Sequence, residues 1–191
     1  MGVNREKVVV DYQVESGGSE KKVNKFALSL KKLAKVALVA LGAAIGKSIL
    51  DFAKFEKSLT NVYTLLDKGT FNKFGKDLEK GALATMKKFG FGIEDTNKAL
   101  FDTISAGVGA GDAIKFMDVA GKLAIGGVTN ISTAVDGLTS VMNAYGIENF
   151  DATKAANTFF TAQKFGKTTV EALANSIGQI APIANSAGMS F

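Results

Sequence analysis

The chain has 191 residues, of which 47% are apolar and 21% charged, a composition typical of folded proteins. It contains no Cys, His or Trp, which excludes disulfides, thiol and histidine catalysis, and metal sites built from His or Cys. Residues 1–57 carry 11 Lys or Arg and 6 Asp or Glu, whereas residues 58–191 carry 12 of each. The net charge of +5 therefore lies in the N-terminal part.

Residues 1–19 are predicted to form a short strand followed by a break. Apolar side chains alternate onto one face of residues 7–15, KVVVDYQVE, as in a half-buried strand. They are Val8, Val10, Tyr12 and Val14. The segment SGGSE at 16–20 interrupts this pattern.

Residues 20–66 are predicted to form an apolar and basic helical arm. Apolar residues recur at spacings of three and four, and lysines lie on another face of the same helix. The apolar residues are Phe26, Leu30, Leu33, Ala37, Ala40 and Ala44, and the lysines are Lys21, Lys25, Lys32 and Lys35. Isolated glycines cost a helix only about 1 kcal/mol each, so we expect one or two long, alanine-rich helices here.

The segment VALVALGAAIGKSILDF at 36–52 raises three interpretations. A phosphate-binding loop needs four residues between its two glycines, but only three separate Gly42 from Gly46, and the preceding pattern is helical rather than a strand. A membrane span needs about 20 apolar residues, whereas 11 residues separate Lys35 from Lys47. We therefore favour a packed or self-associating helix.

Small side chains in this helix form a candidate interface. They permit two helices to approach closely, either in water or in lipid. The predicted helix–helix or membrane interface consists of Ala40, Gly42, Ala43, Ala44 and Gly46.

Residues 67–191 are predicted to form an all-α core domain of helical hairpins. Amphipathic segments separated by polar clusters and glycines predict six helices. These cover residues 71–89, 91–109, 111–125, 129–147, 151–165 and 167–189. Short connections make neighbouring helices antiparallel.

A weak internal repeat supports this organisation. The first apolar residues of three of the helices are Ile93, Ile131 and Val170, and their separations are 38 and 39 residues. A recurring unit of this length is typical of stacked helical hairpins.

Several local motifs have structural interpretations. GVGAG at 107–111 lacks the preceding strand and the third glycine of a dinucleotide fingerprint, so it predicts a turn between helices. The carboxylates of Asp112, Asp118 and Asp136 are interpreted as helix caps and surface charges. Because no nucleophile is matched with a base, we predict that the protein is not an enzyme and needs no cofactor.

Three further features concern helix packing and helix ends. Pro182, the only proline, is expected to kink or interrupt the last helix, and Thr168 with Glu171 is a candidate capping box. Most of the 14 phenylalanines are expected to pack in the core, with an exposed apolar stripe as the alternative. Those at helical positions are Phe52, Phe55, Phe71, Phe74, Phe89, Phe91, Phe101, Phe116, Phe159, Phe160 and Phe165.

From about Phe55 to Phe191 the sequence resembles the core region of phage tail tape measure proteins, found in siphophages and in tail-derived elements of prophages. The resemblance begins with FEKSLTNV at 55–62 and continues with EDTNKALFDTISAGV at 94–108. Its more specific parts are a helix ending in Asn-Ala-Tyr-Gly at 143–146 and the final segment with Ala-Pro-Ile-Ala and Ala-Gly-Met-Ser.

The resemblance implies a structural protein of the virion tail. Such a protein lies in the lumen of the tail tube, is the scaffold on which the tube assembles, determines tube length, and leaves before or with the DNA. It implies self-association as a trimer or hexamer, assembly in the bacterial cytoplasm, coiled-coil regions, and contacts with the tail tube protein, assembly chaperones and tail-tip proteins. Because tape measure proteins are several times longer, we expect the core domain to continue beyond residue 191 in a longer parent protein.

Two alternative functions remain open at this point. A membrane-active or pore-forming protein would use residues 36–52 and the lysines beside them, with transient membrane contact. A nucleic-acid-binding helical module would use lysine–phosphate contacts and lose affinity with salt. Arg5 is the only arginine, which argues against sequence-specific reading of bases.

Overall fold

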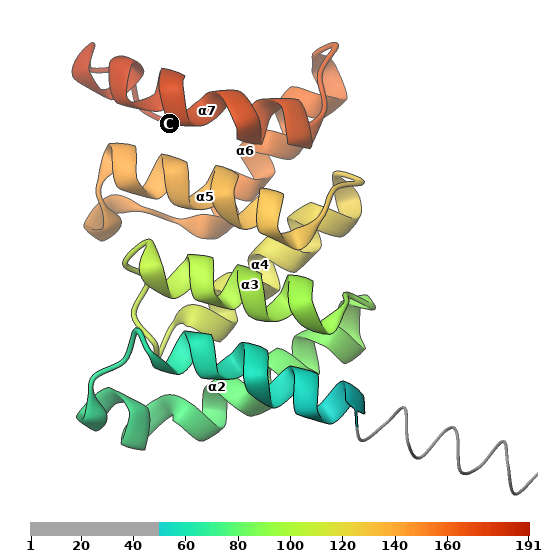
Figure 1. Ribbon diagram of the computed structural model, residues 1–191. Coiled ribbons are helices and arrows are strands. Elements are labelled where there is room, and N and C mark those ends of the chain that lie inside the picture. Colours follow the sequence, from blue (N-terminus) through green and yellow to red (C-terminus); the bar gives the residue numbers. More distant parts are fainter. Residues whose placement is uncertain (1–49) are drawn as a thin grey trace, which may run out of the picture. The chain divides into compact units, whose positions relative to one another are not determined.

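Residues 50–191, the part of the chain described by the computed structural model, contain helices and no strand (Figure 1). The predicted all-α fold is confirmed for these residues. The described residues begin within a helix that runs to residue 63, referred to below as the first helix. The later elements are α2 (Lys68–Phe89), α3 (Ile93–Ser105), α4 (Ala113–Gly126), α5 (Ile131–Tyr145), the 3₁₀ turn η1 (Ile147–Asn149), α6 (Ala152–Phe165) and α7 (Val170–Ser186). The predicted strand at 7–15 and most of the predicted arm lie outside the described residues.

The helices form two layers (Figure 1). In one layer α3 packs against α5, and α5 packs against α7. In the other layer α2 packs against α4, and α4 packs against α6. Each hairpin contributes one helix to each layer, so the predicted stack of helical hairpins is confirmed.

The starts of three helices follow the predicted repeat. The helices α3, α5 and α7 begin at Ile93, Ile131 and Val170, the residues whose separations indicated the repeat. Two of these residues, Ile131 and Val170, are completely buried. Burial of the first apolar residue fixes the rotation of each helix within its layer.

Polar caps explain where several helices begin. The Asp67 carboxylate accepts hydrogen bonds from the backbone N–H groups of Gly69 and Thr70 at the start of α2. Asn130 and Asp151 cap α5 and α6 in the same way. The Thr70 hydroxyl donates a further bond to Asp67, and these bonds lower the pKa of Asp67 because they favour its charged form.

The predicted capping box at Thr168 and Glu171 is wrong by one residue. The cap of α7 is Thr169, whose hydroxyl oxygen accepts from the backbone N–H of Ala172 at 3.0 Å. Thr169 has an extended backbone, so the helix starts at the buried Val170. Burial of Val170 therefore decides the start of the helix.

The core extends into the segment that the sequence assigned to the arm. Phe55, Leu59 and Val62 from the first helix are buried, and the Asn97 side-chain amide of α3 donates to the carbonyl oxygen of Phe55 at 3.2 Å. The folded unit runs from Leu50 to Phe191 rather than from residue 67, because this helix is the layer partner of α3.

The phenylalanines are divided between core and surface. Phe55, Phe116 and Phe159 are buried as expected. Phe52, Phe71 and Phe165 are exposed, and the other five named above are half-buried. The core is completed by small and aliphatic side chains, which allow the helices to approach closely.

Pro182 is expected to kink or interrupt the last helix, and the expectation of an interruption is wrong. The helix α7 continues through Pro182 to Ser186. Both Pro182 and Gly178, the residue whose carbonyl loses its helical partner, are exposed, so water can hydrate that carbonyl. The glycine-rich segment at 107–111 lies in the connection between α3 and α4, as predicted.

Candidate interaction surfaces

The predicted interface residues Ala40, Gly42, Ala43, Ala44 and Gly46 lie outside the described residues. Among residues 50–191, no group of three or more acidic residues is placed to hold a metal ion. None of the helices in this part of the chain is both long and apolar enough to cross a membrane. The surfaces that the described residues do offer are two faces of the helix stack.

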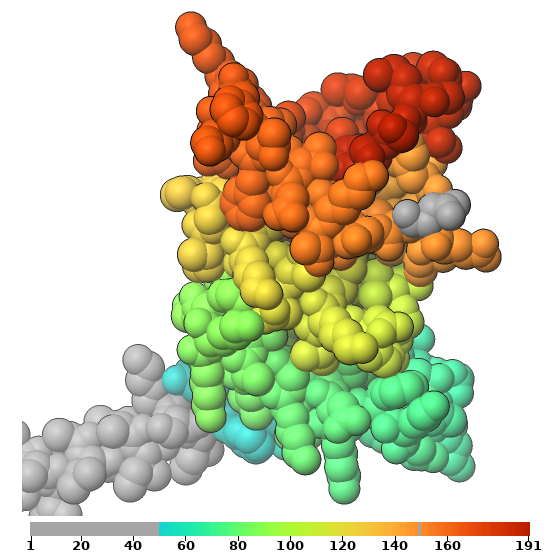
Figure 2. All heavy atoms as spheres, turned by 180° about the vertical axis from the view of Figure 1, so that it is seen from behind, coloured from blue at the N-terminus to red at the C-terminus, as the bar shows by residue number. Residues whose placement is uncertain are grey.

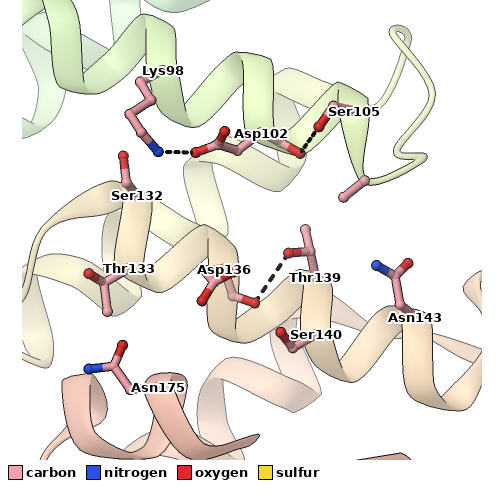
Figure 3. A pocket seen from close by; sticks show the side chains of 11 residues that line it. Lys98, Asp102, Ser105, Ser132, Thr133, Asp136, Thr139, Ser140, Asn143 and Asn175 are labelled. Carbon is pink, nitrogen blue, oxygen red and sulfur yellow. Dashed lines mark hydrogen bonds and ion pairs between the residues drawn. The ribbon is translucent and has the colours of Figure 1, made fainter. Parts of the chain in front are cut away.

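A polar groove of about 500 Å³ crosses the layer of α3, α5 and α7 (Figure 3). Most of its lining side chains carry hydroxyl, amide or carboxylate groups. The lining residues are Lys98, Asp102, Ser105, Ala106, Ser132, Thr133, Asp136, Thr139, Ser140, Asn143 and Asn175. Such a surface offers many hydrogen-bond donors and acceptors and few apolar contacts.

The repeat brings these side chains together. Lys98, Asp136 and Asn175 occupy equivalent positions of α3, α5 and α7, separated by the same 38 and 39 residues as the helix starts. Figure 3 shows them projecting from three neighbouring helices of one layer into one groove. The Lys98 ammonium pairs with Asp102 at 2.6 Å, whereas Asp136 has no ion-pair partner among the described residues. Among residues 50–191, the groove therefore presents the carboxylate of Asp136 without an ion-pair partner, beside neutral polar groups and the Lys98–Asp102 pair.

The opposite face of the stack is basic. Lysines follow one stripe of α2 at spacings of three, four and seven residues: Lys73, Lys76, Lys80 and Lys87. The buried residues of α2, among them Leu78 and Ala82, lie on the other side of the helix. Figure 2 shows this face of the stack, from which long side chains project into solvent.

The two layers differ in charge. The helices α2, α4 and α6 carry ten lysines and three acidic residues. The helices α3, α5 and α7 carry one lysine and five acidic residues. One face is therefore positive and the other weakly negative.

An ion-pair cluster joins two helices of the basic layer. The Asp118 carboxylate on α4 accepts hydrogen bonds from Lys122 of the same helix, at 2.8 Å, and from Lys88 of α2. These bonds and the two nearby positive charges lower the pKa of Asp118. The interpretation of Asp118 as a surface charge thus holds.

The interpretation of Asp112 as a helix cap is only partly supported. Asp112 is the residue before α4, but its side chain makes no capping hydrogen bond.

Neither face was identified from the sequence. The lysines of residues 58–191 are balanced by acidic residues, so the overall charge gives no sign of a basic face. Which lysines share a face follows only from the arrangement of the helices in two layers. The repeat spacing of Lys98, Asp136 and Asn175 was the signal that could have predicted the groove.

A two-layer stack of helical hairpins with a repeat of 38 and 39 residues defines a helical-repeat protein. Residues 79–191 match the family described as "Phage-related minor tail protein", which is more than half of the chain. The chain belongs to this family, and it is therefore a component of the phage tail.

A curated relative agrees with the family. The chain is 26% identical over 166 residues to the "Probable tape measure protein" of Clostridium phage phiCD119. This alignment covers 83% of the chain and 17% of the relative, so the chain spans about one sixth of that protein's length. No solved structure matches the chain. The resemblance to tape measure proteins is confirmed.

Proposed function

We propose that the protein is a non-enzymatic tape measure and scaffold of the phage tail, which nucleates assembly of the tail tube, determines its length, and leaves before or with the DNA. The observation that carries the proposal is the similarity of 83% of the chain to a probable tape measure protein. The stack of helical hairpins at residues 50–191 would be one folded body of this scaffold.

The two faces of the stack suit a protein that contacts several partners at once. The basic face of α2, α4 and α6 can attract acidic surfaces over about a Debye length, 8 Å at physiological salt. The polar groove can hydrogen-bond to a polypeptide. The proposed partners are further copies of the chain, as a trimer or hexamer, and the tail tube protein, assembly chaperones and tail-tip proteins.

The proposed location follows from this role. The protein would bind its chaperones in the bacterial cytoplasm while the tail is assembled. In the finished virion it would lie in the lumen of the tail tube.

The test is made in a phage or prophage that carries this sequence. In-frame deletions in helical regions outside the compact unit of residues 50–191 should shorten the tails by about 1.5 Å for each helical residue removed. Tail length is measured by electron microscopy, and the protein is detected by mass spectrometry of purified tails. Tails of unchanged length across a deletion series would exclude length determination.

A second arm tests the scaffold role of the folded unit. Leu138→Asp places a charge in the buried core and should abolish tails, leaving tailless capsids. Val128→Asp, which introduces the same charge at a valine that is 88% exposed, is the matched control and should leave tail number unchanged. Normal tails in the Leu138→Asp variant would contradict the proposal.

A further inference from the structure

The lysine stripe of α2 has a regular spacing. Lys73, Lys80 and Lys87 recur every seven residues, so they lie on nearly the same side of the helix. With a rise of about 1.5 Å per residue, successive members are about 10.5 Å apart along the helix axis. All three side chains are exposed, and none of them forms an ion pair among residues 50–191. The helix therefore presents a row of ammonium groups about 21 Å long.

The polar groove of the other layer has a matching spacing (Figure 3). It crosses α3, α5 and α7, which are neighbours in their layer, and the axes of packed helices are about 8 to 10 Å apart. Each helix contributes a side-chain oxygen that can accept hydrogen bonds: Asp102 from α3, Asp136 from α5 and Asn175 from α7. The separation of these helices is thus close to the separation of successive lysines in the stripe.

The two surfaces are also complementary in charge and in hydrogen bonding. A lysine ammonium group has three donors and no acceptor, whereas an ionised carboxylate only accepts. Asp136 is exposed and has no ion-pair partner among the described residues. The helices α2, α4 and α6 have an excess of lysines, and α3, α5 and α7 have an excess of acidic residues. A helix with the surface of α2, placed in the groove, would therefore bring opposite charges together.

We propose that the occupant of the groove is a second copy of this chain, whose α2 lies across α3, α5 and α7 with Lys73, Lys80 and Lys87 each over one of these helices. The proposal rests on the proposed function, because it names the surfaces through which copies of the scaffold associate. The contact is heterologous, since the basic face of one copy meets the groove of the next. Each pair retains one free basic face and one free groove, so further copies can add in the same direction.

The contact is expected to be weak and to depend on salt. Ion pairs between exposed side chains each contribute little, so several must form at once. The Debye length falls from about 8 Å at physiological salt to about 3 Å in molar salt, which screens such pairs. In sedimentation equilibrium, the mass of the 191-residue chain should rise with concentration at low salt and return to that of a monomer in molar salt. A monomer at low salt, or association that does not respond to salt, would overturn the proposal.

A pair of charge reversals tests which surfaces meet. Lys80→Glu on α2 and Asp136→Lys in the groove should each weaken self-association by about tenfold, because like charges then face each other. Both residues are exposed, so each variant should keep the circular dichroism spectrum and melting temperature of the unsubstituted chain. The control is Lys167→Glu, which makes the same charge change in the connection between α6 and α7 and should associate normally.

Mixing the two variants distinguishes this contact from other modes of association. An equimolar mixture of Lys80→Glu and Asp136→Lys should associate like the unsubstituted chain, because each basic or reversed face then finds a groove of opposite charge. Unchanged association of either single variant, or a mixture that associates as weakly as its components, would overturn the proposal. Tail length plays no part in this measurement, so its outcome is distinguishable from a failure of the proposed length-determining function.

Discussion

The two layers of the stack are built from the same repeat but meet solvent with different chemistry. The layer of α3, α5 and α7 has a polar groove lined by hydroxyls, amides and carboxylates. The layer of α2, α4 and α6 has exposed lysines. The repeat fixes which residues are buried and leaves the outer side chains free to differ, so one fold can carry two interaction surfaces.

Two buried glycines, Gly137 of α5 and Gly121 of α4, have different kinds of neighbour. A side chain at Gly137 of α5 would meet the Cβ of Ala174 on α7 at 2.8 Å and its Cα at 3.2 Å. A side chain at Gly121 of α4 would meet the ring of Phe89 at 2.6 Å. The Cβ and Cα of Ala174 are fixed to the backbone of α7, whereas the half-buried ring of Phe89 can turn, so the site at Gly137 has less room to adjust than the site at Gly121.

The largest expected effect comes from the buried centre of the groove layer. Leu138→Ala should lower the free energy of unfolding by about 3 kcal/mol, because Leu138 is fully buried and a cavity remains. The measurement is urea unfolding followed by circular dichroism. Leu65→Ala, at an exposed leucine, is the control and should change stability by about 0.5 kcal/mol or less. A similar loss in both variants would show that the core has been placed wrongly.

A pair of glycine substitutions compares how well these two sites accept an added methyl group. Gly137→Ala should cost about 2 kcal/mol, because the new methyl group pushes α7 away. Gly121→Ala should cost about 1 kcal/mol or less, because the ring of Phe89 can move and alanine favours the helix. Both values come from urea unfolding. If Gly121→Ala proves the more damaging of the two, the ring of Phe89 does not move aside and the site at Gly121 is the tighter one.

The sequence predicted the parts of this fold that follow from periodicity. The starts at Ile93, Ile131 and Val170 and the turn at 107–111 are recoverable because apolar spacing and glycine positions depend on local sequence. Residues 50–63 were assigned to the arm because their pattern runs on from residue 20, and only contacts such as that of Asn97 with Phe55 place them in the core. The faces depend on how distant helices stack, which local patterns do not encode.

The ion-pair cluster of the basic layer should make a small contribution that depends on pH. The folded-state pKa of Asp118 is lowered, so its stabilising effect is present above the ordinary carboxyl pKa of about 4 and disappears as the pH falls through the lowered value. Asp118 is about one-third exposed, at 34%, which keeps the contribution at neutral pH below about 1 kcal/mol. Asp118→Asn should remove it.

The control for this prediction is Asp95→Asn in α3. The carboxylate of Asp95 is exposed and makes no ion pair among the described residues. Unfolding free energies are compared at pH 7 and pH 3, and only Asp118→Asn should reduce the difference between the two. An equal reduction by both substitutions would mean that the ion pair between α2 and α4 is not the cause.

The smallest effect on stability is expected for the lysine stripe, although its effect on binding should be clear. Replacing Lys76, Lys80 and Lys87 by glutamine should alter the free energy of unfolding by less than about 0.5 kcal/mol, because all three are exposed. It should lower the salt concentration needed to elute the chain from a cation-exchange column, because neighbouring like charges on one helix face act together.

The matched variant replaces Lys54, Lys57 and Lys98 by glutamine, which changes the net charge equally. These lysines belong to helices of the groove layer, where Lys98 is already paired with Asp102. The elution shift should therefore be smaller for the matched variant, and equal shifts would show that the two faces do not differ in their attraction for an acidic surface.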